Sequence, residues 1–202
     1  MPGIRDNGCV TGKKIMVRRI TMLKKVLAAV LALCMMFAAL AGCGITPGTE
    51  EDTGEAGSKA ADPASIRVTV DLPDGWEEKP NNFANYQAVK ETSMFTVTSS
   101  RKLSSDNDIV EYVNKDIDTM KQAFGDAEFS GTEKIDIDET EGVRFHADFE
   151  ISGMKQRQIY CYYFKHGLVI MVQGAYMLNE DNAGAASAEI EKLISSVKTE
   201  KQ

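Results

Sequence analysis

The segment VRFHADFEI, residues 143–151, alternates apolar and polar side chains at almost every position. A period of two residues puts the apolar set on one face of an extended chain, so the segment predicts a half-buried β-strand. Ser152-Gly153 follows as a tight turn,. The segments 155–164 and 168–176 are rich in aromatic and β-branched residues,. Together the three segments predict an antiparallel array joined by short hairpins.

The chain before this array predicts four more strands, at 66–72, 83–90, 94–101 and 128–138. The first alternates in the same way and ends at a turn, Pro73-Asp74-Gly75,. We therefore expect a mostly antiparallel twisted sheet of about six to seven strands.

Two segments have helical periodicity instead. Ser105 and Asp108 stand at capping-box spacing before a stripe that ends at Gly125, formed by Ile109, Val113, Ile117, Met120 and Phe124,. A closing helix is expected from 182 to 198, with the stripe Ala186, Ile190, Leu193, Ile194 and Val197,. The predicted fold class is α+β, with two main helices covering the sheet in one domain, residues 66–199.

The N-terminal 42 residues contain the parts of an export signal in the usual order. A basic head, Met22-Leu23-Lys24-Lys25, precedes an apolar run from Val26 to Ala41. At 1.5 Å per residue the run is roughly 24 Å long, short for a membrane-spanning helix and typical of a signal peptide. The alternative is an anchor that is never cleaved.

The run ends in Leu40-Ala41-Gly42-Cys43, which resembles the lipobox of bacterial lipoproteins. The resemblance implies cleavage between Gly42 and Cys43 and attachment of diacylglycerol to the Cys43 thiol, with fatty acids such as palmitate. Residues 43–65 are rich in small, polar and acidic side chains and predict a flexible tether,. We expect the domain on the extracytoplasmic face of the cell membrane, with the membrane as partner through the lipid.

Charge excludes one class of partner. Residues 1–42 hold seven Lys or Arg and one acidic residue, so the chain from Cys43 onward has 16 basic and 29 acidic residues and a formal charge of −13. Such a surface repels phosphate backbones, so nucleic-acid binding is not expected. From Cys43 onward the only other cysteine is Cys161, which we expect to be buried in a strand,.

Two stretches carry a family resemblance over residues 65–199. They are Leu72-Pro73-Asp74-Gly75-Trp76, after the opening strand, and Leu193-Ile194-Ser195-Ser196-Val197, in the closing helix. With the order of elements, they resemble the PsbP/DcrB/Mog-like α/β proteins. The resemblance implies an antiparallel sheet between helices. Members include a photosystem accessory protein, a Ran-binding protein and bacterial envelope lipoproteins, and they share no catalytic residues, so it implies a binding role by analogy.

Metal-binding patterns are absent from the sequence. His146 and His166 have no Cys or His at ligand spacing,. The acidic stretch 136–142 misses the EF-hand pattern, because its Gly comes one position late and no Glu follows at the required distance,. We expect a charged strand end and turn there, and neither a metal nor a cofactor.

Catalytic patterns are also weak. Two stretches match patterns of penicillin-binding enzymes: Ser195-Ser196-Val197-Lys198 matches Ser-x-x-Lys, and Ser105-Asp106-Asn107 matches Ser-Asp-Asn,. In this chain the order of the two patterns is reversed, and the third pattern, Lys-Thr-Gly, is missing,. The pairs Asp136 with Asp138 and Asp148 with Glu150 are each two residues apart on a strand, about 6.6 Å, which favours a solvated acidic face,. We therefore expect no enzymatic activity.

Four aromatic residues are candidates for lining a ligand groove, Trp76, Tyr86, Tyr160 and Tyr162, and core packing is the alternative,. The expected function is a non-catalytic accessory or binding module of the cell envelope that meets an envelope protein or a small ligand. The alternatives are a small-ligand carrier with an aromatic groove and an envelope hydrolase that uses acidic residues.

Overall fold

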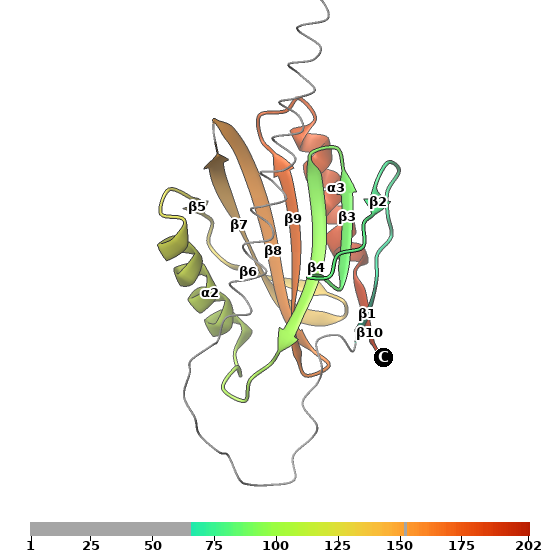
Figure 1. The fold of residues 1–202 in the computed structure, drawn as a ribbon. Helices are drawn as coiled ribbons and strands as arrows, with labels where there is room; N and C mark the ends of the chain where they lie inside the picture. Colours follow the sequence, from blue (N-terminus) through green and yellow to red (C-terminus); the bar gives the residue numbers. More distant parts are fainter. Residues whose placement is uncertain (1–65, 152) are drawn as a thin grey trace, which may run out of the picture. The chain divides into compact units, whose positions relative to one another are not determined.

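A computed structural model describes residues 66–151 and 153–202 of the chain (Figure 1). The predicted export signal, the cleavage position at Gly42 and Cys43, and the tether up to residue 65 lie outside these residues. Within them the fold is α+β, as the sequence predicts, and all paired strands are antiparallel.

The described residues contain two helices and ten strands. The helices are α2 Ile109–Ala123 and α3 Ala183–Ser196. The strands are β1 Ile66–Thr69, β2 Glu77–Glu78, β3 Tyr86–Lys90, β4 Ser93–Arg101, β5 Glu128–Phe129, β6 Glu133–Ile137, β7 Thr140–Ile151, β8 Met154–Lys165, β9 Leu168–Met177 and β10 Lys198–Lys201. Neither of these helices is long and apolar enough to cross a membrane.

Eight strands form one sheet in the order β2-β3-β4-β9-β8-β7-β5, and β6 also pairs with β7. The register places Tyr160 of β8 opposite both Phe145 of β7 and Gln173 of β9. The first and last strands of the domain pair separately, with Val68 of β1 opposite Thr199 of β10.

Two-residue turns set the register of the later strands. Asp138 and Glu139 between β6 and β7 have φ angles of 52° and 62°, and His166 and Gly167 between β8 and β9 have φ angles of 57° and 76°. Positive φ at both central residues is the geometry of a type I′ turn, whose twist matches that of a hairpin. These turns fix the register of each strand pair, so the apolar side chains of both strands lie on the same face of the sheet.

Helix α3 covers one side of the sheet and passes behind β9, β4 and β3 in Figure 1. Its buried residues Ile190, Leu193 and Ile194 belong to an apolar core with side chains of β3, β4, β8 and β9. Gly174 of β9 makes the close approach possible, because a Cβ atom there would lie 2.2 Å from Cγ2 of Ile190.

Helix α2 packs against β7 and β8. The predicted stripe is confirmed, since Val113, Ile117 and Met120 are buried. The predicted cap is wrong by three residues, because Asp108 and not Ser105 is the N-cap. The Asp108 carboxylate accepts hydrogen bonds from two backbone N–H groups of the first turn, which satisfies donors that the helix leaves unpaired,.

The predicted strand number, six to seven, is too low, because three short features were missed. The segment 128–138 is interrupted before β6, and it gives β5 and β6 instead of one strand. The two-residue strand β2 is too short for a periodicity to show,. The closing helix ends at Ser196, two residues before the predicted end, since Val197 has extended angles and leads into β10.

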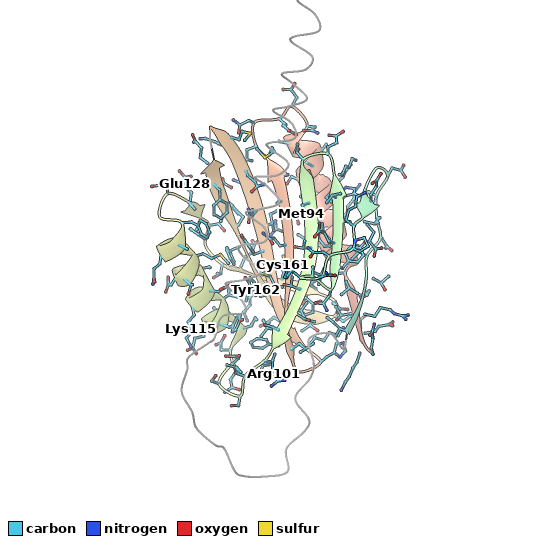
Figure 2. All side chains as sticks on the ribbon, viewed as in Figure 1. Met94, Arg101, Lys115, Glu128, Cys161 and Tyr162 are labelled. Carbon is cyan, nitrogen blue, oxygen red and sulfur yellow. The ribbon has the colours of Figure 1, made fainter. Side chains whose placement is uncertain are left out.

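Cys161 lies on β8 with no exposed surface, so its predicted burial in a strand is confirmed. Burial raises the pKa of its thiol to about 12,. Cys161 and Tyr162, both labelled in Figure 2, are neighbours on β8 and therefore point to opposite sides of the sheet,. Cys161 belongs to the α3 core, whereas Tyr162 faces α2.

Candidate functional site

Five polar side chains lie side by side on the side of the sheet away from α3. Gln173 of β9 stands opposite Tyr160 of β8 and opposite Thr96 of β4. Gln158 and Gln156 precede Tyr160 by two and four residues on β8, so strand alternation brings them to the same side,. We call the surface formed by these five residues the glutamine face.

The side chains of the glutamine face form one hydrogen-bonded chain. Nε2 of Gln173 donates to Oε1 of Gln158 at 2.8 Å, and the Tyr160 hydroxyl donates to the same oxygen. Nε2 of Gln158 in turn donates to Oε1 of Gln156 at 2.7 Å. At the other end, the Thr96 hydroxyl lies 3.5 Å from Oε1 of Gln173. Gln158 is thus the centre of the network.

The glutamine face is buried, which makes its polar groups energetically important. Gln158, Gln156 and Gln173 expose 0%, 2% and 3% of their surface. Among the described residues, Nε2 of Gln156 is the buried side-chain nitrogen that has no hydrogen-bond partner. A buried donor without a partner costs about 1–3 kcal/mol, so this amide group lowers the stability of the free domain.

No charged side chain lies on this side of the three strands that carry the glutamine face. By alternation from the five residues above, the side chains on this side are Met94, Thr96, Thr98 and Ser100 of β4, Met154, Gln156, Gln158, Tyr160, Tyr162 and Phe164 of β8, and Val169, Met171, Gln173, Ala175 and Met177 of β9,. Charged groups of other segments do reach this side, because the Asp116 carboxylate accepts from Tyr162 and Nζ of Lys102 lies 4.8 Å from the centroid of the Phe164 ring.

Small and flexible apolar residues border the amides. Ala147 of β7 and Ala175 of β9 both stand opposite Gln158, and each projects only a methyl group. Met177 stands opposite Gln156, and Met94, labelled on β4 in Figure 2, stands opposite Ala175. Methionine adapts its shape to irregular apolar surfaces, so these positions suit contact with a variable apolar group.

Aromatic side chains under α2 bound the glutamine face on the β7 side. The rings of Phe145 and Tyr160 stack with centroids 4.9 Å apart. The Tyr162 hydroxyl donates to the carboxylate of Asp116 on α2. Burial raises the pKa of Asp116, and the hydrogen bond from Tyr162 opposes that rise. On this side α2 contacts β7 and β8, and the side chains of β4 and β9 such as Met94 and Gln173 are buried as well.

Charged side chains from the middle of β7 lie on the side of the sheet that faces away from the glutamine face. Arg157 of β8 donates to both carboxylate oxygens of Asp148 on β7, at 2.7 and 2.6 Å. Arg144 pairs with Glu191 of α3, with one contact at 2.9 Å. His146 lies half-buried between these pairs on β7, and burial lowers its pKa. Each arginine is matched by a carboxylate, so these pairs tie the helix and strands together.

The structure places the four predicted aromatic site residues on two sides of the sheet. Trp76 and Tyr86 belong to the α3 core, and Nε1 of Trp76 donates to Glu189 of α3 at 2.8 Å. Tyr160 and Tyr162 face the other side, next to α2. All four are at least nine-tenths buried. The structure therefore brings Tyr160 and Tyr162 together and separates them from the other two.

The acidic candidates are also separated. Asp136 is exposed on β6, whereas the Asp138 carboxylate is buried and lies 2.8 Å from Nζ of Lys165. Asp148 is paired with Arg157, and Glu150 is exposed. Among the described residues no group of three or more His, Cys, Asp or Glu side chains is placed to hold a metal ion.

Sequence reasoning did not find the glutamine face. Its signal was present as two glutamines at alternate positions of β8, Gln156 and Gln158, and a third inside the apolar strand β9, Gln173. Polar amides at positions that alternation assigns to a buried surface are unusual, because burial of an amide requires partners. The register between β8 and β9 was needed to show that the three meet.

No protein-family model and no curated protein matches the chain. Among solved structures, the domain is similar to LpqN, a protein involved in cell envelope biogenesis of Mycobacterium tuberculosis, with a TM-score of 0.51 and 14% identity over 68% of this chain and 86% of that one. Cyanobacterial PsbP (CyanoP) of Synechocystis sp. PCC 6803 matches with a TM-score of 0.48 and 16% identity, covering 74% of this chain and 98% of that one. The similarity to LpqN supports an α+β fold of the same kind, at low sequence identity.

Proposed function

We propose that this chain is a lipid-anchored protein of the bacterial cell envelope, and that its domain binds a ligand at the glutamine face without catalysing a reaction. The anchoring part rests on the sequence Leu40-Ala41-Gly42-Cys43 after a short apolar run. The binding part rests on the geometry of the face. LpqN, whose fold is similar, is described as involved in cell envelope biogenesis, which agrees in kind with an envelope role.

One observation carries the binding role, namely the buried and unpartnered Nε2 of Gln156. An apolar residue at this position would pack against Phe149 and Met177 across the strands without the penalty of an unpaired amide,. A ligand oxygen that accepts from Gln156 would remove that penalty. Polar groups that weaken the free protein in this way are typical of binding sites, which trade stability for recognition.

Anchoring is tested by metabolic labelling with a fatty-acid analogue. We expect the wild-type chain and the Cys161→Ala variant to take up the label, because Cys161 is buried. The Cys43→Ala variant is expected to remain unlabelled and to stay uncleaved. A labelled Cys43→Ala protein would contradict the proposed anchor.

Binding is tested in intact cells with a photo-crosslinking amino acid at Met171, on the glutamine side of β9, and at the exposed Gln122 of α2 as control. We expect adducts of one discrete mass at Met171 that are absent at Gln122. An adduct with a protein would favour the accessory role over ligand binding. Equal labelling at the two positions would count against a site on this face.

A further inference from the structure

We propose that the domain docks on the lipid surface of the membrane through one end of its sheet, and that Leu103 inserts among the lipids there. This inference rests on the anchoring part of the proposed function and states how the anchored domain is oriented. We call this surface the docking end. It is formed by the loop of residues 101–108, the turn between β8 and β9, and the β1–β10 pair.

The strand pairings bring these three parts to the same end of the sheet. Arg101, the last residue of β4, pairs with the first residue of β9, and the backbone N–H of Lys102 donates to the carbonyl of Gly167 at 3.3 Å. In the same turn, Nε2 of His166 lies 3.1 Å from the carbonyl oxygen of Thr199 on β10. Figure 1 shows the end of β4, the turn between β8 and β9, and β10 at the lower end of the domain.

A leucine is displayed at this end. Leu103 exposes 59% of its surface, although it lies in a hydrogen-bonded turn. Its backbone N–H donates to the carboxylate of Asp106 at 2.8 Å, and its carbonyl accepts from the backbone N–H of the same residue at 3.1 Å. The turn therefore holds the leucine in an exposed position. Transfer of such a side chain from water into the boundary between lipid headgroups and acyl chains is favourable.

Two basic residues directly precede this leucine. Arg101, labelled in Figure 2, is exposed, and Nζ of Lys102 lies over the ring of Phe164. Neither of them forms an ion pair with another described residue. The carboxylates of the same loop, Asp106 and Asp108, accept hydrogen bonds from backbone N–H groups and are thus turned toward the protein. The loop therefore offers its positive charge to a partner.

The opposite end of the sheet is acidic. Its loops carry the exposed side chains of Glu91, Glu150 and Asp181, with Lys155 beside them. An anionic lipid surface attracts Lys and Arg and repels carboxylates, so the favoured orientation puts the docking end toward the lipid. This polarity allows a chain with a formal charge of −13 from Cys43 onward to approach such a surface.

The chain enters the domain at the docking end. Ile66, the first described residue, stands opposite Lys201 on β10. The tether proposed for residues 43–65 therefore leads from the anchor to the end that carries Leu103. Because the anchor keeps the domain close to the membrane, even a weak contact with lipid is sufficient for docking.

A second copy of the chain is the main competitor for this surface. A stable interface between two proteins buries about 800 Å² on each partner and has an apolar centre. Of the large apolar side chains that are exposed among the described residues, Leu103 is the one in the loop 101–108. One leucine beside two bases falls far short of such an interface. Insertion into lipid requires no matching surface, so lipid is the better partner.

The experiment uses the mature lipoprotein in vesicles of phosphatidylcholine mixed with phosphatidylglycerol, with a nitroxide spin label on one introduced cysteine. Ser104→Cys places the label at the docking end, and Asp181→Cys places it at the opposite end, both at exposed positions. Cys161 is buried and its pKa is raised to about 12, so it does not react. Oxygen concentrates in lipid and a nickel chelate stays in water, so their collision rates with the label report its immersion.

We expect vesicles to raise oxygen collisions and lower nickel collisions for the label of Ser104→Cys, and to leave the label of Asp181→Cys in water. Replacing Leu103 by Ser should make docking about tenfold less favourable. The matched control is Phe83→Ser, which removes a side chain that is 67% exposed in the loop between β2 and β3 and should leave docking unchanged.

The contribution of charge is tested in the same way. Replacing Arg101 by Gln should weaken docking about fivefold on these vesicles and have little effect on phosphatidylcholine alone. The control Lys155→Gln, at the opposite end, should have little effect on either. Equal effects of the two substitutions would contradict a basic docking end.

The mass of the mature chain shows separately whether Cys43 carries lipid. If it does and both labels stay in water, or if the label of Asp181→Cys is immersed instead, the docking end is wrong although the anchor stands. If Cys43 carries no lipid, the proposed anchor fails, and immersion of the Ser104→Cys label at high vesicle concentration still decides the docking. Spin–spin broadening at Ser104→Cys without vesicles would show contact with a second copy and overturn the lipid partner.

Discussion

The carboxylate of Asp138 accepts two hydrogen bonds from Thr199, one from the backbone N–H at 3.0 Å and one from the side-chain hydroxyl. Nζ of Lys165 lies 2.8 Å from the same carboxylate oxygen. Asp138 sits in the turn between β6 and β7, and Thr199 lies on β10, so one buried side chain ties the last strand of the domain to the main sheet.

Replacing Asp138 by Asn is predicted to destabilise the domain by about 3 kcal/mol. The substitution leaves the half-buried Lys165 without its counter-charge, and breaking such a pair from one side is costly,. The free energy of unfolding from urea denaturation measures the effect. The control is Glu139→Gln, which removes the exposed pair with Lys198 and should cost no more than about 1 kcal/mol,. Equal losses in the two variants would contradict a clamp at Asp138.

Replacing Gly174 by Ala is predicted to cost about 1–3 kcal/mol, because the new Cβ would overlap Cγ2 of Ile190,. The matched control is Gly184→Ala at the start of α3, where a Cβ meets nothing within 4 Å and a small gain is expected,. In an Ile190→Ala background the obstructing atom is gone, so Gly174→Ala should cost less there. The same cost in both backgrounds would show that another contact is responsible.

Because the pKa of His146 is lowered in the folded domain, we expect the domain to lose stability in mild acid,. Burial, and then Arg157, lower its pKa in the folded domain, while Asp148 opposes the change. In the unfolded chain the pKa returns to about 6.5, so between the two values the unfolded state binds more protons. The stability contributed by the neutral ring is therefore present above pH of about 6.5 and is lost as the pH falls below it.

The test compares urea denaturation of the wild type and of His146→Gln from pH 8 to pH 5. Other groups titrate in both proteins, so the difference between the two curves isolates the histidine. We expect that difference to change in favour of the variant as the pH falls. A constant difference would mean that His146 is not buried enough to resist protonation.

Much of the fold could be predicted because the local periodicity of apolar residues determines its helices and strands. The stripe of α2 and the alternation of β7 come from residues close in sequence, and both are confirmed. Strand β10 could not be predicted in this way, because its four residues are polar or charged and become a strand only by pairing with β1, more than a hundred residues earlier.

The candidate site was harder to predict for the same reason. Trp76, Tyr86, Tyr160 and Tyr162 were selected by residue type, and the structure divides them between two sides of the sheet. The glutamine face arises from the register of three strands, which no local pattern specifies. In hindsight, Gln173 inside an otherwise apolar strand was the position where local preference and the fold disagree, and such positions often belong to functional sites.

Within the glutamine face, Gln158 and Gln156 are predicted to differ sharply in their effect on stability. Replacing Gln158 by Met removes the acceptor of Tyr160 and Gln173 and the donor to Gln156, so three polar groups lose a partner. We expect a loss of about 2–4 kcal/mol, since the buried amides of Gln173 and Gln156 each lose a hydrogen bond at a cost of about 1–3 kcal/mol and the effects overlap. Replacing Gln156 by Met also leaves Gln158 with an unused donor, but it removes an amide nitrogen that already has no partner. The two changes nearly cancel, so the expected effect is within about 1 kcal/mol. Thermal and urea unfolding of both variants, without added ligand, measure the difference. A large loss for Gln156→Met would mean that its amide nitrogen already has a partner in the free protein, and the argument for an open binding position at Gln156 would fail with it.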